Sequence, residues 1–170
     1  PVGCNILFPS GNGYANIDAI HFFVEEIFPL VKRKIPYAKF MISNPCNELK
    51  KEYSARGDIS MLAFARNICE TYKRADIVVV PLRTGSGLKI KVLESMSFGK
   101  PTIFSRVAAQ GVELIGYSQE CISDEPGILS REIVKVLTDD CYRKNLISSG
   151  ITVIKKCYNQ HKVYSELRER

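Results

Sequence analysis

Residues 81–94 combine glycine, lysine and glutamate at spacings that suit the binding of an anion. Gly85 and Gly87 follow an apolar run and precede an amphipathic stretch. Because glycine carries no Cβ atom, the backbone there can turn tightly and approach a ligand closely. A helix that begins after such a turn presents free N–H groups and the positive end of its dipole, which favour phosphates. The segment is therefore predicted to bind a phosphorylated ligand.

Glu94 is the unusual residue of the helix expected over residues 88–98. Apolar side chains surround it on more than one face of that helix. A carboxylate that is buried in such surroundings needs a partner. The functional interpretation is a hydrogen bond to the hydroxyl groups of a ligand. The alternative is an ion pair with Lys91 or a solvated position, and the residues alone leave both open.

The elements on either side place this segment at the edge of a parallel sheet. Residues 77–80 form an unbroken β-branched run, which is typical of a strand buried on both faces. Pro81 is expected to end the strand, because proline cannot donate to a sheet ladder. Gly99 is placed to be the left-handed cap of the helix, and Pro101 cannot continue it. Since ligands bind at the carboxyl ends of strands in open α/β sheets, the turn is expected to hold the ligand.

Strand and helix patterns alternate along the rest of the chain. Further strands are expected at 5–10, 39–43, 59–63 and 102–104, with a short last strand at 121–123. Asn16 is expected to cap the first long helix with Asp18 in its first turn. Pro29 is expected to kink or restart that helix. The alternation predicts an α/β fold, a doubly wound, Rossmann-like parallel sheet with helices on both faces.

The composition argues against several classes of function. The chain has 170 residues, enough for one ordinary domain, and no apolar run approaches the ~20 residues of a membrane span. The net charge of +6 favours acidic ligands, but the basic residues form no stripe interleaved with aromatic side chains, so nucleic acid is not an expected partner. The six cysteines form no C-x-x-C pair and the two histidines lack metal-ligand spacing, so no metal site is expected. Dispersed, reduced cysteines indicate a cytoplasmic setting.

A long, ordered pattern begins at Ala75. It consists of A-D, a hydrophobic strand, and then P-L-R-x-G-x-G-x-K-x-K-x-L-E-x-M-x-x-G-x-P. This pattern resembles the C-terminal, nucleotide-sugar-binding domain of GT-B-fold glycosyltransferases, in the large group called family four or group 1. The residues that carry the resemblance are Ala75, Asp76, Pro81, Leu82, Arg83, Gly85, Gly87, Lys89, Lys91, Leu93, Glu94, Met96, Gly99 and Pro101.

The resemblance implies a domain organisation and a reaction. Residues 1–170 would be a single donor-binding domain, one Rossmann-like half of a GT-B fold, with the N-terminal acceptor domain absent from this chain. Relatives of this kind move a sugar from a nucleotide diphosphate sugar to an acceptor, without a metal and with retention of configuration. The chain is therefore expected to be part of a glycosyltransferase, to need no cofactor besides its donor substrate, and to be inactive on its own.

The resemblance also implies roles for residues of the glycine-rich turn. Lys89 and Arg83 would be the cations nearest to the leaving diphosphate, and they are the candidate catalytic residues. The backbone amides of Gly87, Leu88 and Lys89 would face the diphosphate. Glu94 would bind the ribose hydroxyl groups of the donor.

Two other loops would border the same ligand in the family. Gly11 would let the first loop approach the diphosphate, although the Arg and Lys that many members add there are absent, and a plain strand–helix turn is the alternative. Ser86 stands where many relatives carry the first of two glutamates, and its hydroxyl group can hydrogen-bond a sugar. Phe64, Ala65 and Arg66 would lie against the nucleobase, although Phe64 equally suits the core.

The resemblance further implies partners. They are a nucleotide sugar, the N-terminal domain of the same protein, and an acceptor that is a carbohydrate, a lipid or a protein. A peripheral membrane contact through the N-terminal half, on the cytoplasmic face, would also fit. Two other functions on this fold stay open: a non-catalytic nucleotide-sugar-binding or regulatory module, and a sugar epimerase.

Overall fold

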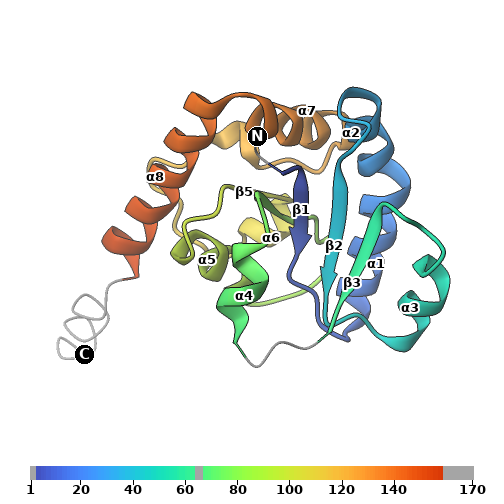
Figure 1. Ribbon diagram of the computed structural model, residues 1–170. Helices are drawn as coiled ribbons and strands as arrows, with labels where there is room; N and C mark the ends of the chain where they lie inside the picture. The colour runs from blue at the N-terminus through green and yellow to red at the C-terminus, as the bar shows by residue number, and fades with distance from the viewer. Residues whose placement is uncertain (1–2, 64–66, 159–170) are drawn as a thin grey trace.

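The computed structural model describes residues 3–63 and 67–158, which form one parallel sheet covered by helices (Figure 1). The strand order is β3-β2-β1-β4-β5, and every neighbouring pair is parallel. From β1 the chain proceeds outward to β2 and β3, and then crosses to the other side of β1 for β4 and β5. This reversal confirms the doubly wound, Rossmann-like α/β fold. The strands are β1 (Asn5–Phe8), β2 (Lys39–Ser43), β3 (Ile59–Leu62), β4 (Ile77–Val80) and β5 (Thr102–Phe104).

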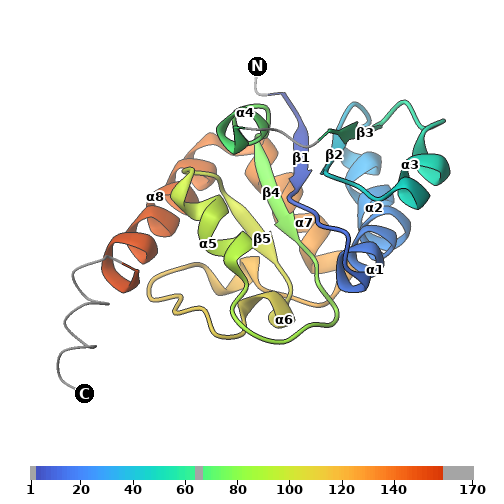
Figure 2. The ribbon, with the colours of Figure 1, turned by 90° about the horizontal axis from the view of Figure 1, so that it is seen from below.

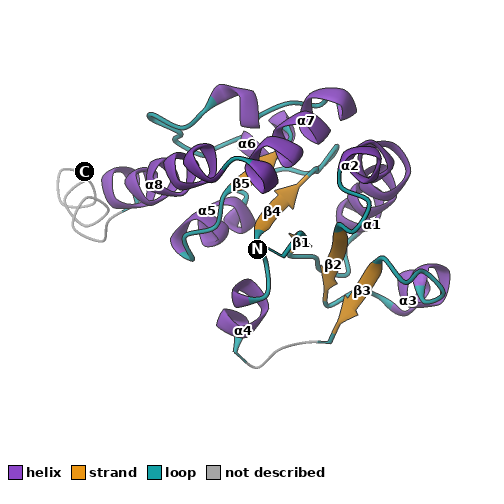
Figure 3. Ribbon diagram, turned by 45° about the horizontal axis from the view of Figure 1, so that its top comes forward, coloured by secondary structure: helices purple, strands orange, loops and turns teal. Residues whose placement is uncertain are grey.

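Helices cover both faces of the sheet, as Figures 2 and 3 show. One face is covered by α1 (Tyr14–Phe22), the π-helical segment η1 (Phe23–Ile27), α2 (Phe28–Lys34), α3 (Asn47–Tyr53) and α7 (Pro126–Thr138). The other face is covered by α4 (Ile68–Lys73) and α5 (Ile90–Ser97). The long helix α8 (Asp140–Cys157) packs against both α5 and α7. Two short helices, α6 (Arg106–Ala109) and the 3-10 helix η2 (Gln119–Cys121), lie in the connection after β5.

The central strand β4 shows why the sequence folds this way. All four of its residues are buried, because a strand between two helical layers has no solvated face. Gly99 ends the following helix α5 in the left-handed conformation, with φ of +64°, as predicted. Among the described helices, none is both long and apolar enough to cross a membrane.

Pro29 restarts the helical segment after β1, as the sequence indicates. A five-residue π-helical segment separates α1 from α2, and Pro29 lies in the first turn of α2. Proline has no N–H group to donate, so its place at a helix start leaves no hydrogen bond unmade.

Three details of the expected fold are wrong. Asn16 does not cap α1, because the helix begins earlier, with Gly13 as its cap and the Gly13 carbonyl accepting from the Asn16 N–H at 2.9 Å. Asp18 therefore lies beyond the first turn, where it contacts a different partner. The strand expected at 121–123 is reduced to one isolated bridge between Phe104 and Ile122, because the preceding residues are wound into η2.

Candidate functional site

A pocket opens at the carboxyl edge of the sheet, where the strand order reverses between β1 and β4. In Figure 2 the segment that follows β4 runs toward α1 before it turns back to α5. This path brings the start of α1, the loop 81–89 and the start of α5 around a pocket of about 300 Å³. Its lining residues are Ala15, Asn16, Leu82, Thr84, Gly85, Ser86, Leu88, Lys89, Ile90 and Lys91.

The loop 81–89 has a conformation that depends on its glycines and on Lys89. Gly85 and Gly87 have φ of +125° and +74°, which residues with a Cβ atom rarely adopt. The Lys89 ammonium donates to the Ser86 and Gly87 carbonyls, at 2.9 Å each, and only 8% of the residue is exposed. An ammonium group has three donors, and the third N–H of Lys89 makes no hydrogen bond to another described residue.

Arg83 is held by α1 and does not line the pocket. Its Nε atom donates to Asp18 Oδ2 at 3.0 Å, its Nη2 atom donates to Asp18 Oδ1, and its guanidinium lies 4.9 Å from the centre of the Phe22 ring. The hydrogen bonds from Arg83 lower the pKa of Asp18 below its usual value. The structure thus gives this candidate catalytic cation an acidic partner that the sequence did not suggest.

Glu94 has a partner that neither interpretation of the sequence included. The Tyr72 hydroxyl group donates to Glu94 Oε1 at 2.6 Å, and the buried Tyr72 ring stacks on Phe98 with ring centres 4.5 Å apart. Lys91 is a close electrostatic neighbour, since burial lowers its pKa and the charge of Glu94 opposes that shift. Glu94 does not line the pocket described above. No signal in the sequence distinguishes Tyr72 from an ordinary core aromatic residue.

Asn16 does not occupy the helix cap that its residue type suggests. It lines the pocket, and its Oδ1 atom is buried without a hydrogen-bond partner among the described residues. Gly11 does not line the pocket, but a Cβ atom at Gly11 would lie 3.5 Å from Asn16 Nδ2. The first turn of α1 therefore contributes an amide oxygen to the pocket wall.

The structure thus brings together part of the expected set. Ser86, Leu88 and Lys89 line the pocket, and Gly87 lies in the same loop. Phe64, Ala65 and Arg66 lie outside the described residues. A smaller pocket of about 110 Å³ opens at the ends of β1, β2 and β3, and its lining includes Ser10, Ser43, Asn44, Ala63 and Tyr72.

Comparison with known proteins identifies the family. The model of the family described as "Glycosyl transferases group 1" matches residues 3–139. This chain belongs to the group 1 glycosyl transferases. No curated protein matches this glycosyltransferase domain in sequence.

Solved structures agree with this family at the level of the fold. TarM superposes with a TM-score of 0.80 at 13% identity, over 98% of this chain and 34% of TarM. HepE from Anabaena, crystallised with UDP and glucose, gives 0.75 at 12% identity, over 98% of this chain and 47% of HepE. The C-terminal domain of LpcC, a group 1 family protein from Francisella tularensis, gives 0.69 at 14% identity, over 92% of this chain and 86% of that domain. The glycosyltransferase domain thus spans about a third of TarM and about half of HepE, and its fold is that of a GT-B domain.

Proposed function

We propose that this chain is the donor-binding half of a glycosyltransferase that moves a sugar from a nucleotide diphosphate sugar to an acceptor. The observation that carries the proposal is the pocket between α1 and the loop 81–89, at the switch point of the sheet. Ligands of open α/β sheets bind at such switch points. Membership of the group 1 family supports sugar transfer in general terms.

The diphosphate is proposed to lie against the residues that precede α5. The backbone N–H groups of Gly87, Leu88 and Lys89 donate no hydrogen bond to another described residue. Together with the remaining N–H of the Lys89 ammonium, they can receive phosphate oxygens. Fixed donors aimed at a departing charge lower the barrier to its departure, so these groups would stabilise the leaving diphosphate without a metal or another cofactor. Retention of configuration is proposed from the family resemblance.

Two acceptors are proposed to bind hydroxyl groups of the donor. Tyr72 occupies Oε1 of Glu94, and Oε2 makes no hydrogen bond to another described residue. Glu94 Oε2 would accept from the ribose hydroxyl groups, and Asn16 Oδ1 would accept from a hydroxyl group of the transferred sugar. An acceptor atom suits a hydroxyl group and not a phosphate, because a phosphate oxygen has no proton to donate at this site.

The acceptor-binding half is proposed to be an N-terminal domain of the same protein. This fits the share of TarM and HepE that the chain spans. The 170-residue chain would then bind the donor but not transfer the sugar, and the whole enzyme would work in the cytoplasm.

Calorimetric titration of the chain with UDP, GDP, ADP and the matching monophosphates tests the proposal. UDP is the first probe, because HepE was crystallised with UDP and UDP-glucose. One diphosphate should bind with one-to-one stoichiometry, more tightly than its monophosphate and less tightly at high salt. Amide NMR shifts should move at residues 85–91. If no nucleotide binds, or if the shifts map to another surface, the donor-binding role is wrong.

A non-catalytic nucleotide-binding module is the second candidate. The pairing of Arg83 with Asp18 favours it, because one of the two expected catalytic cations already has an acidic partner. Sugar transfer by the two-domain protein would exclude this candidate. Nucleotide binding without transfer would support it, and conversion of the nucleotide sugar with no acceptor would indicate an epimerase instead.

A further inference from the structure

A second pocket lies between α2 and α7, two helices that pack against each other on one face of the sheet (Figure 1). Its volume is about 360 Å³, within the range of small-molecule sites. Leu30, Ser130 and Val134 contribute to its largely apolar walls, together with three cations, Arg33, Lys34 and Arg131. It shares no lining residue with the pocket at the start of α5.

Two of the three cations have no compensating charge. Arg33 and Lys34 are exposed in the last turn of α2, and neither makes an ion pair with any residue in 3–63 or 67–158. A helix C-terminus favours cations, so the dipole of α2 is one reason for their position. It does not explain Arg131, which lies within α7.

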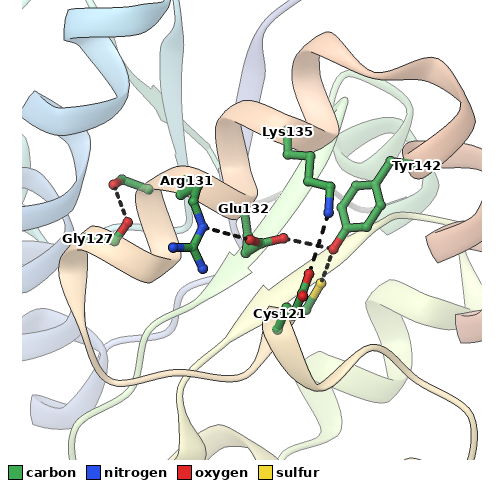
Figure 4. Close-up of polar contacts among 8 residues, drawn as sticks. Cys121, Gly127, Arg131, Glu132, Lys135 and Tyr142 are labelled. Carbon is green, nitrogen blue, oxygen red and sulfur yellow. Dashed lines mark hydrogen bonds and ion pairs between the residues drawn. The ribbon is translucent and has the colours of Figure 1, made fainter.

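Arg131 is paired with a buried carboxylate, although its own side chain is 65% exposed. Its Nε atom donates to Glu132 Oε1 at 3.2 Å, and Glu132 is only 1% exposed. The Tyr142 hydroxyl group donates to Glu132 Oε2 at 2.8 Å. Figure 4 shows that the two terminal nitrogens of Arg131 point away from Glu132. Glu132 therefore balances the charge of Arg131. The terminal N–H groups of Arg131 make no hydrogen bond to another described residue, so they can bind an anion.

We propose that this pocket binds an amphiphilic anion, an alkyl chain that ends in a phosphate group. The apolar walls would hold the chain. Arg131 would bind the phosphate oxygens through its planar group, which matches phosphate geometry. A phosphate monoester carries a charge of about −1.5 to −2 at neutral pH. This charge would balance the two unpaired positive charges of Arg33 and Lys34. The site is independent of nucleotide binding at the carboxyl edge of the sheet.

Calorimetric titration of the chain with decyl phosphate, below its micelle-forming concentration, tests this proposal. Inorganic phosphate controls for the head group alone, and decyl glucoside for the chain alone. We expect one-to-one binding of decyl phosphate, at least tenfold tighter than either control. Shortening the chain to octyl phosphate should weaken binding by about fourfold for each CH₂ group removed. Equal affinity for decyl glucoside, or no saturable binding of decyl phosphate, would overturn the proposal.

Substitutions locate the site. The double variant Arg33→Gln/Lys34→Gln should lose at least tenfold in affinity for decyl phosphate. Lys155→Gln is the matched control, because Lys155 is also exposed in the last turn of a helix but lies on α8, and it should change nothing. Arg131→Lys keeps the charge on α7 but removes the planar guanidinium group, so its affinity for decyl phosphate should fall severalfold. An unchanged affinity in Arg33→Gln/Lys34→Gln would show that binding occurs elsewhere.

A vesicle assay distinguishes the pocket from a membrane surface. One result would be that the chain sediments with phosphatidylglycerol vesicles and yet does not bind decyl phosphate one-to-one. This result would mean that the cations attract a bilayer surface and that the pocket binds no alkyl phosphate. That outcome also contradicts the proposal. UDP affinity should be the same in all these variants, so a failure here leaves the donor-binding role untouched.

Discussion

The hydroxyl group of Tyr72 on α4 donates a 2.6 Å hydrogen bond to Glu94 on α5. The contact joins two helices that cover the same face of the sheet, and it fixes one oxygen of the carboxylate. Hydrogen bonds to charged groups contribute about 1.5–3 kcal/mol, so Tyr72 both stabilises this layer and orients Glu94.

Tyr72→Phe should lower the free energy of unfolding by about 1–3 kcal/mol, because Glu94 loses its donor while the ring stays in place. Chemical denaturation measures the change. Tyr14→Phe is the control, since Tyr14 is 79% exposed and its loss of a hydroxyl group should have little effect. Equal stability of Tyr72→Phe and the parent chain would mean that the hydrogen bond contributes nothing.

Glu94→Gln should weaken binding of the preferred nucleoside diphosphate about tenfold or more, because a charged acceptor for the ribose hydroxyl groups is lost. The same titration with the 2′,3′-dideoxy analogue is the control. Parent and variant should bind that analogue alike, since it has no ribose hydroxyl group to offer. If Glu94→Gln does not change the affinity for the full nucleotide, Glu94 does not bind the ribose hydroxyl groups.

Asp18 should make the stability of the chain depend on pH in the acid range. Arg83 lowers the pKa of Asp18 in the folded state, so the folded chain binds this proton less readily than the unfolded chain. The stabilisation is present above the unfolded value near pH 4, and it is lost as the pH falls through the lower folded value. Thermal denaturation between neutral pH and pH 2 measures the effect. The melting temperature of Asp18→Asn should fall less steeply with decreasing pH than that of the parent chain.

The partner variant tests the cause of that pH dependence. Arg83→Gln should reduce the loss of stability at acid pH as much as Asp18→Asn does. The double variant should show the same pH dependence of stability as either single variant. Additive effects of the two substitutions would show that the two side chains act separately.

Gly87→Ala should destabilise the chain by about 1–2 kcal/mol, because the residue has φ of +74°. The added Cβ atom would meet no atom within 4 Å, so backbone strain is the only cost. Gly57→Ala is a matched control, since its Cβ atom also meets nothing within 4 Å and its φ is not positive. Gly57→Ala should be neutral or slightly stabilising in thermal denaturation, and an equal loss in both variants would contradict the argument from φ.

Local patterns in the sequence were enough to predict the frame of this domain. The β-branched run of β4, the glycines of the loop 81–89 and the Gly99 cap are each set by neighbouring residues, and the structure confirms all three. The side-chain contacts of the site were not predictable in the same way. Tyr72 and Glu94 lie 22 residues apart, and Asp18 and Arg83 lie 65 apart. Such pairs depend on how the helices pack, which hydrophobic periodicity does not specify.

The Asn16 error has a related cause. Its residue type favours a helix cap, but the Gly13 carbonyl accepts the Asn16 N–H and the helix starts before it. The side chain is thereby placed in the pocket wall.

The two hydrogen bonds from the Lys89 ammonium to the Ser86 and Gly87 carbonyls close a ring of four residues. A chain segment closed in this way has less conformational entropy to lose when a ligand binds. The N–H groups ahead of α5 are then preorganised, so binding an anion requires little further ordering. Lys89 would thus contribute to affinity twice, through its charge and through the rigidity it gives the loop.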